Sequence, residues 1–362
     1  MKKAFVKTPV FLFAFVVATF VMATGLLTAC GGGGAPPAPA ANPTAPAGAG
    51  ESATPDQSSD TDAAAKGLKI AMIMQGPISD MSWNYNAYYA LTLMEKDGAT
   101  ISYNENADPA DLVEYVRTYG SEGYNLVMIN DDRNQEDVVA AAADFPDTQY
   151  IIVNSMTTSD NVQAIFFADQ DQGFMAGVIA ALLTQTGKVG FVGGLEFIPI
   201  INGAKGFQQG VAYIDPSIEA QVVYTGDFVD SVKAKNQALA LIEGGADVLV
   251  PNADAASQGV VEAAQEKGVL VVTNGEGMET FGPDAVVISV NKDTYVGYYD
   301  TYQRYLAGTI NADGPKVYGA GQGLISFGEW LDPTGVVTDD IRARVQQAMD
   351  ALSNGEVVID LN

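Results

Sequence analysis

The sequence predicts an α/β fold of two doubly wound lobes joined by a hinge, and three observations support that prediction. From residue 68 onward, short apolar runs rich in Val and Ile alternate with helical patterns. The runs are continuous, as expected of strands that are buried on both faces of a parallel sheet. The chain has 362 residues, more than the ~250 to 300 at which a single hydrophobic core stops growing. We therefore expect two cores, each a parallel sheet covered by helices.

Each element follows from these alternating patterns. Strands are expected at residues 68–74, 100–103, 126–130, 150–154, 164–168, 188–192, 221–224, 247–250, 269–273 and 286–290. Helices are expected at residues 84–96, 109–121, 135–144, 172–185, 203–213, 231–243, 257–266 and 294–307. A new series of strands begins near Gly187. We therefore assign residues 67–186 to lobe 1, with a return segment at about 277–312, and residues 187–276 to lobe 2, with a C-terminal segment at about 313–362.

The N-terminus has the pattern of an export signal. Three lysines within the first seven residues precede an almost uninterrupted apolar run from Val10 to Ala29, as in a signal peptide. A run of ~20 apolar residues is also long enough for an uncleaved membrane anchor. Leu27-Thr28-Ala29-Cys30 resembles a bacterial lipobox, and Cys30 is the only cysteine. We therefore expect a lipoprotein signal peptide at residues 1–29 and a lipid on Cys30 that holds the protein at the extracytoplasmic face of the cell membrane.

Residues 30–66 are expected to form a disordered tether. After Cys30 they are almost entirely Gly, Ala, Pro, Ser, Thr and Asp, with no aromatic or large aliphatic residue. Such a segment cannot bury enough apolar surface to offset its chain entropy.

The composition excludes several classes of function. The chain has no His, which rules out Ser-His-Asp and Cys-His nucleophiles and the HExxH zinc helix. Its formal net charge of −26 excludes nucleic acid as a partner, because nucleic-acid binders carry a basic footprint. Adjacent acids such as Asp131 and Asp132 are expected to be exposed by-products of an acidic composition. We expect no metal, no cofactor and no enzymatic activity, although an acid-only mechanism stays open.

Several motifs resemble those of one receptor family. Ser79–Asn84 resembles the D-x-S-F-N signature of the basic membrane protein (BMP) family. These are ABC-transporter substrate-binding lipoproteins that include the purine nucleoside receptors. Further motifs follow in the family's order at Phe166–Asp169, Gly173–Gly177, Thr186–Gly194, Gly206–Gly210 and Gly244–Val248. The resemblance covers the chain from about Lys69 to its end, and it implies the fold of type I periplasmic binding proteins.

The resemblance also implies ligand-binding residues in lobe 1. Asp80 precedes a helix, where its carboxylate either caps backbone N–H groups or binds the ligand, and the family pattern favours the ligand. Trp83 replaces the usual Phe, and it either stacks on a flat ring or belongs to the core. Asn84 and Tyr88 are four residues apart, so they share a helix face and can meet one ligand. Asp169 matches a family Asp whose expected partner is a sugar hydroxyl, and otherwise it caps the next helix.

Four more candidates come from later in the chain. Lys292 stands where the nucleoside receptors carry a Lys, and otherwise it is a surface charge. Asn274 and Glu276 stand where the family often has a ribose-binding Asp. Gly203 stands where the family has an aromatic residue, and Phe197 is expected to supply a substitute ring.

Together these features predict a lipid-anchored, extracytoplasmic solute-binding component of an ABC importer. It is expected to be a monomer that binds a nucleoside or a similar polar small molecule in an interlobe cleft and presents it to permease subunits. Two alternatives stay open: an extracytoplasmic nucleoside-cleaving hydrolase that uses acidic residues, and a sensory receptor of the same fold.

Overall fold

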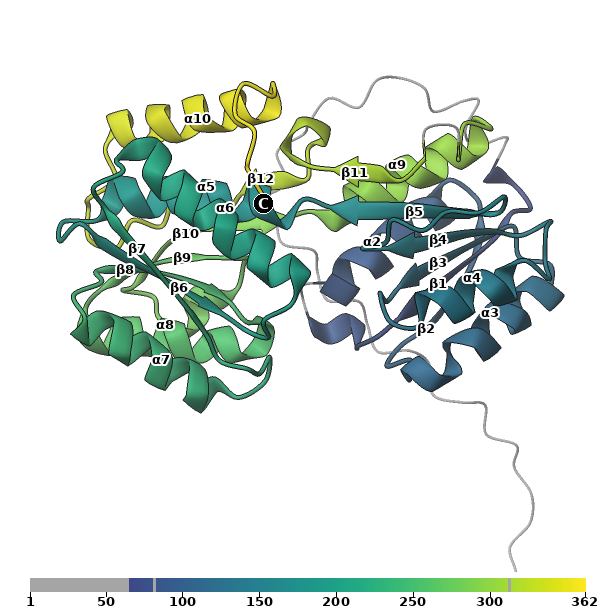
Figure 1. The fold of residues 1–362 in the computed structure, drawn as a ribbon, viewed down its shortest axis with the longest axis horizontal. Coiled ribbons are helices and arrows are strands. Elements are labelled where there is room, and N and C mark those ends of the chain that lie inside the picture. Colours follow the sequence, from purple (N-terminus) through teal and green to yellow (C-terminus); the bar gives the residue numbers. More distant parts are fainter. Residues whose placement is uncertain (1–64, 81–82, 312–313) are drawn as a thin grey trace, which may run out of the picture. The chain divides into compact units, whose positions relative to one another are not determined.

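Two parallel sheets, each covered by helices on both faces, organise the fold (Figure 1). The computed structural model describes residues 65–80, 83–311 and 314–362. The expected signal peptide, the lipidation site Cys30 and the tether up to residue 64 lie outside the described residues. No helix among the described residues combines the length and the apolar character that a bilayer span requires.

The first sheet has six parallel strands in the order β11-β5-β4-β3-β1-β2. Helices α2 and α9 cover one face, and α3 and α4 cover the other. The strands are β1 (Lys69–Met74), β2 (Thr100–Asn104), β3 (Leu126–Asn130), β4 (Gln149–Val153), β5 (Val162–Phe167) and β11 (Lys316–Tyr318). The helices are α2 (Trp83–Lys96), α3 (Leu112–Ser121), α4 (Gln135–Ala142) and α9 (Thr294–Leu306).

The second sheet has the order β12-β10-β9-β8-β6-β7 and is parallel except for the pairing of β10 with β12. Helices α5 and α6 cover one face, and α7 and α8 cover the other. The strands are β6 (Lys188–Gly193), β7 (Glu219–Tyr224), β8 (Val248–Asn252), β9 (Leu270–Thr273), β10 (Val286–Lys292) and β12 (Ile325–Phe327). The helices are α5 (Asp169–Leu183), α6 (Ile198–Ile214), α7 (Ser231–Glu243), α8 (Ser257–Lys267) and α10 (Asp339–Ser353), which packs on α5.

The continuous apolar runs are explained by burial on both faces. Along β1, Ile70 and Met72 point into the core beneath α2, whereas Ala71 and Ile73 point into the core beneath α3 and α4. The α/β prediction is confirmed, and all ten expected strands are present with ends shifted by a few residues. Strands β11 and β12 and helix α10 are additional to the expected elements.

Within the residues that the structure describes, the chain passes between the sheets at three crossovers. The first crossover (residues 167–171) leads from β5 to α5, which packs on the second sheet. The second crossover (residues 291–294) leads from β10 back to α9, which packs against α2 and β5. The third crossover (residues 318–326) leads from β11 in the first sheet to β12 in the second.

These crossovers differ from the segment boundaries expected from the sequence. α5 and β10, expected in lobe 1, pack in the second sheet, and β11, expected in lobe 2, pairs with β5 in the first sheet. The reason is that α5 is buried along nearly its whole length and around its circumference. A helix without a polar face gives no sequence pattern that identifies the sheet it covers.

Glycines allow α5 and α6 to pack backbone against backbone. A Cβ atom on Gly173 would lie 1.9 Å from the carbonyl oxygen of Gly203, and one on Gly210 would lie 2.0 Å from that of Phe174. The same holds at Gly177, whose Cβ would lie 2.2 Å from the carbonyl oxygen of Phe207. The glycines of the G-x-x-x-G motifs Gly173–Gly177 and Gly206–Gly210 are therefore required by the packing of α5 against α6.

Candidate functional site

Two of the crossovers bring Asp169 and Lys292 into direct contact. Asp169 opens α5 immediately after β5, and Lys292 ends β10, 123 residues later. The Lys292 ammonium donates to Oδ1 of Asp169 in an ion pair. The Asp169 side chain is 4% exposed and that of Lys292 is 20% exposed. The site therefore has a buried carboxylate whose charge is partly balanced by a lysine from the other half of the chain.

Trp83 adjoins this ion pair. The Nζ atom of Lys292 lies 5.4 Å from the centroid of the Trp83 ring, within the range of a cation–π interaction. The Trp83 and Phe167 rings meet edge to face at 5.8 Å between centroids. Phe167 ends β5, two residues before Asp169. Trp83, Asp169 and Lys292 thus form one cluster.

Asn84 belongs to a buried network next to this cluster. Its Oδ1 atom accepts hydrogen bonds from the backbone N–H of Gly76 and from Nδ2 of Asn130, each at 3.2 Å. The Oδ1 atom of Asn130 accepts the hydroxyl of Tyr298 at 2.5 Å. The Asn84 amide is therefore fixed against the ends of β1 and β3.

Tyr88 lies elsewhere on α2. Its ring packs edge to face against Tyr103 of β2, with 5.1 Å between centroids. β2 is the outer strand next to β1, so Tyr88 faces the edge of the first sheet while Asn84 faces its interior. Asn84 and Tyr88 share a helix but contact different strands, and the structure does not bring Tyr88 to the Asp169 cluster.

The candidates of the second sheet lie in loops after its strands. Phe197 precedes α6, is 38% exposed, and meets Phe228 edge to face at 5.9 Å. Glu276 accepts a hydrogen bond from Nδ2 of Asn291 at 3.1 Å, which places it beside the end of β10. Asn274 directly follows β9. Asp80 ends the 3-10 helix Ile78–Asp80, and its side chain is not among those that the structure describes.

Buried polar atoms without partners gather at these strand ends. Among the described residues, no hydrogen-bond partner is present for Oδ2 of Asp169, Nε1 of Trp83, either amide atom of Asn274, Oδ1 of Asn291 or Oδ1 of Asn154, and each is shielded from solvent. An unsatisfied buried polar atom costs about 1 to 3 kcal/mol. Because native proteins contain few such atoms, a group of them beyond the carboxyl ends of parallel strands indicates a binding site.

Asp131 and Asp132 are not exposed by-products of composition, contrary to the expectation. Asp131 is 1% exposed and its carboxylate pairs with Arg133, whose Nε donates at 2.7 Å. Burial, and secondly the charge of Asp131, raise the pKa of Asp132, and Asp169 is close enough to add to this shift. Both residues directly follow β3, a sequence position at which ligand-facing residues of parallel sheets are expected.

Burial also controls the protonation of Asp169. Burial raises the pKa of this carboxyl above its ordinary value, and the neighbouring Lys292 ammonium opposes the shift. Burial raises the pKa of Asp171 as well, against a hydrogen bond from the backbone of Ala320. The acids around the crossovers are therefore easier to protonate than ordinary aspartates.

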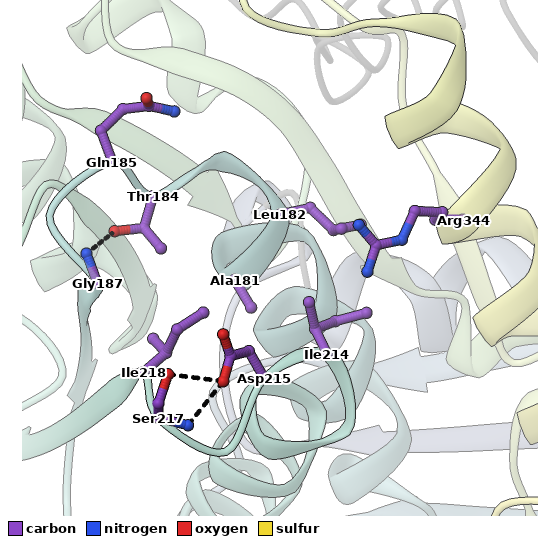
Figure 2. Close-up of a pocket in the computed structure, with 10 residues that line it drawn as sticks. All are labelled: Ala181, Leu182, Thr184, Gln185, Gly187, Ile214, Asp215, Ser217, Ile218 and Arg344. Carbon is purple, nitrogen blue, oxygen red and sulfur yellow. Dashed lines mark hydrogen bonds between the residues drawn. The ribbon is translucent and has the colours of Figure 1, made fainter.

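A separate surface hollow of about 410 Å³ lies where α5 and α6 end, beside α10 (Figure 2). Ser217 donates to Asp215 through its backbone N–H and its hydroxyl, and Thr184 accepts from Gly187. These polar groups already serve local turns. The hollow contains none of the candidate ligand-binding residues.

The family of the chain follows from comparison with known proteins. The family model described as "Bmp: ABC transporter substrate-binding protein PnrA-like" matches residues 68–354. The chain belongs to the Bmp family. The expected membership is confirmed, and the Bmp family is one of substrate-binding proteins of ABC transporters.

Curated relatives share about a quarter of their residues with this Bmp protein. A purine-binding protein from Brucella abortus is 24% identical over 80% of this chain and 82% of its own length. The ABC transporter nucleoside-binding protein BmpA from Lactococcus lactis is 29% identical over 55% of this chain and 58% of its own. The transcriptional activator protein med from Bacillus subtilis is 23% identical over 76% of this chain and 86% of its own.

Solved structures confirm the fold. An ABC transporter solute-binding protein from Conexibacter woesei matches with a TM-score of 0.70 and 25% identity, over 81% of this chain and 98% of its own. A transcriptional activator of the comK gene from Bacillus halodurans matches with a TM-score of 0.69 and 22% identity, over 81% of this chain and 100% of its own. The periplasmic-binding-protein fold expected for this Bmp protein is thereby confirmed.

Proposed function

We propose that this Bmp protein is a lipid-anchored receptor that captures a nucleoside, or a similar hydroxyl-rich small molecule, and presents it to an ABC permease. The observation that supports this most directly is the unpartnered Oδ2 atom of Asp169. It belongs to a buried carboxylate whose other oxygen is held by Lys292. A ligand hydroxyl that donates to Oδ2 would satisfy it, and a ligand lacking that hydroxyl would leave it unpaired.

The other polar groups of the site suit the same class of ligand. Asn274 offers a donor and an acceptor, Asn291 an acceptor, and Trp83 a donor. Such a mixture matches the hydroxyls and the ring edge of a nucleoside. The purine-binding and nucleoside-binding names of two relatives support this class.

The charge of the site favours the nucleoside over the nucleotide. Asp132, Asp169 and Glu276 outnumber Lys292, the one cation in contact with Asp169 among the described residues. A phosphate would meet the buried Asp169 carboxylate and the partly buried Asp132 in a poorly solvated space, where like charges repel strongly. The proposed ligand is therefore uncharged at the end that Asp169 meets.

Closure around the ligand would be a hinge motion at the crossovers. A ligand that contacts both sheets stabilises the closed form by its differential affinity and shifts an existing equilibrium. The protein would act as a monomer, and its lipid on Cys30 would keep the folded part near the permease. With a net charge of −26, direct contact with nucleic acid is not part of this proposal.

Thermal unfolding with a panel of nucleosides, their 5′-monophosphates and free ribose tests the ligand class. A ligand at one hundred times its Kd adds ~2.7 kcal/mol to the free energy of unfolding. We expect stabilisation by at least one nucleoside and none by its monophosphate. Chromatography of the same mixtures checks for cleavage, and release of free base would favour the hydrolase.

Asp169→Asn tests the contact itself. We expect this variant to weaken nucleoside binding by roughly 10- to 100-fold, the effect of losing a hydrogen bond to a charged group. Asp230→Asn is the matched control, because Asp230 caps α7 on the second sheet. Equal affinities for Asp169→Asn and the wild type would remove Asp169 from the site.

A further inference from the structure

Three aspartates each connect a different pair of crossovers. Asp169 connects the first to the second through its ion pair with Lys292. Asp171 connects the first to the third, because its Oδ2 atom accepts the backbone N–H of Ala320 at 2.8 Å. Asp293 connects the second to the third, because its backbone N–H donates to the carbonyl oxygen of Leu324 at 2.7 Å and its carboxyl lies beside the Ser326 side chain. The three crossovers are thus tied to one another in a closed ring.

The chain is closely packed where Asp171 makes its connection. A Cβ atom on Gly319 would lie 2.5 Å from Oδ2 of Asp171, closer than real Cβ contacts allow. Backbone hydrogen bonds run beside the aspartates, from the N–H of Ala168 to Tyr318 at 2.8 Å and from the N–H of Asp293 to Leu324 at 2.7 Å. The carboxylate of Asp171 therefore joins segments that already lie in contact.

These aspartates hold the only points at which the described chain passes between the sheets. Any rotation of one sheet against the other must be absorbed there, because hinges take up motion in a few residues that link two bodies. Asp171 and Asp293 are both partly buried, and this burial raises the pKa of both carboxyls. A hydrogen bond in such surroundings is costly to break.

We propose that Asp171 and Asp293 are positioning residues of the ligand site. They do not touch the ligand; they fix the three crossovers to one another and so set where Asp169 and Lys292 stand relative to the loops of the second sheet. The proposal rests on the proposed function only for its effect on affinity, since the effect on the arrangement of the sheets needs no ligand.

Spin labels measure that arrangement directly. The full chain carries Cys30→Ser and two labelled cysteines, Thr118→Cys on α3 of the first sheet and Asn236→Cys on α7 of the second, both at exposed positions. Pulsed electron resonance gives the distribution of distances between the labels without ligand. We expect Asp171→Ala to widen or shift this distribution.

Conservative variants separate positioning from simple damage. Asp171→Asn keeps an oxygen that accepts from Ala320, so we expect it to retain the wild-type distribution. Asp230→Ala removes a helix cap on the second sheet and should lower stability without changing the distances. If Asp171→Ala and Asp293→Ala both fold and both give the wild-type distribution, the proposal is wrong.

Gly319 provides a variant that leaves Asp171 in place. Gly319→Ala inserts a methyl group against the Asp171 carboxylate, so we expect it to change the distribution as Asp171→Ala does. In the Asp171→Ala background the methyl meets no carboxylate, and the effect of Gly319→Ala should largely disappear. Additive effects would contradict the connection. If Asp171→Ala does not fold, Gly319→Ala still tests the connection between Asp171 and the third crossover.

Titration with inosine and adenosine completes the test. We expect Asp171→Ala and Asp293→Ala to weaken binding roughly 3- to 30-fold, with Asp171→Asn close to the wild type. If the distances between the spin labels change in the alanine variants but neither nucleoside binds the wild type, the proposed ligand is refuted and the positioning role is upheld. Binding that is normal in both alanine variants would refute the positioning role and uphold the ligand.

Discussion

Gly173 of α5 and Gly203 of α6 lie so close that a methyl group on Gly173 would overlap the carbonyl oxygen of Gly203, at 1.9 Å. The two helices together cover one face of the second sheet. Their packing therefore fixes the position of Asp169, the first residue of α5. The contact depends on backbone atoms, which cannot move aside as a flexible side chain can.

The first prediction concerns this contact. Gly173→Ala should lower the free energy of unfolding by about 3 kcal/mol or more, because overpacking against backbone forces the helices apart. Gly203→Ala is the matched control, since the nearest atom to its Cβ would be Nδ2 of the Asn252 side chain, at 3.1 Å, and the nearest backbone atom, the carbonyl oxygen of Asp169, would lie at 3.8 Å. Urea unfolding measures both variants. A smaller loss for Gly173→Ala than for Gly203→Ala would contradict the packing described here.

The second prediction separates stability from binding at the ion pair. Lys292→Met leaves the buried Asp169 carboxylate without its cation and should lower stability by about 2 kcal/mol, less than for a fully buried pair because Lys292 is partly exposed. Adding Asp169→Asn removes the uncompensated charge and should restore most of that loss. Both variants should bind the nucleoside more weakly than the wild type does. Denaturant titration measures the stability and calorimetry measures nucleoside binding. A double variant that is less stable than Lys292→Met would contradict this prediction.

The third prediction concerns the pH dependence of ligand affinity. Because burial raises the pKa of Asp169, its carboxylate takes up a proton at a pH above the ordinary aspartate value of ~3.9. Affinity should therefore fall as the pH drops through that raised pKa. Ligand affinity measured between pH 7 and pH 4 checks this. In Asp169→Asn, the fall in affinity that is due to protonation of Asp169 should be absent. Asp132→Asn is the control, since Asp132 also has a raised pKa but should leave the Asp169 step in place.

The fourth prediction follows from the raised pKa of Asp171. The Asp171 carboxyl binds its proton more tightly in the folded state than in the unfolded state. The stability linked to Asp171 is therefore fully present below about pH 3.9, the pKa of an ordinary aspartate, and is lost as the pH rises through the folded-state pKa. Asp171→Asn should therefore lose less stability than the wild type between pH 4 and pH 7. Asp227, whose pKa is lowered by the backbone N–H groups of Val229 and Asp230, should give the opposite sign: Asp227→Asn removes stability that is present at neutral pH and lost on acidification. Thermal melts across this range decide both.

The fifth prediction concerns Cys30. If Cys30 carries the lipid, Cys30→Ser should accumulate as a precursor that retains residues 1–29 and carries no acyl group. Mass spectrometry of the purified protein reads the N-terminus and its acyl groups. A wild-type protein that begins at Met1 without acyl groups would show an uncleaved anchor instead.

Much of the fold could be predicted because strands buried on both faces have continuous apolar runs. The ends of the strands, and with them the positions of Asp169 and Lys292, follow from those runs. Strands β11 and β12 are three residues each, too short to show a pattern. Helix α10 did have one, because Thr338 caps it and Ile341, Val345, Ala348 and Leu352 follow at helical spacing.

The arrangement of the site could not be predicted in the same way. The contact between Asp169 and Lys292 joins residues 123 positions apart, and no local pattern encodes it. The environment of Asp131 and Asp132 depends on Arg133 and on the loop after β3. The separate directions of Asn84 and Tyr88 arise because α2 lies across β1, β2 and β3, so that residues one turn apart reach different strands.

The path of the chain also bears on how the protein is made. The edge strand of the first sheet, β11, and that of the second, β12, are both synthesised after residue 315. Neither half can therefore complete its sheet while the ribosome is still working through the first three hundred residues. A nascent chain must keep both unfinished edges apart until the last segment emerges, and a truncation that removes this segment would leave two exposed edges on one molecule.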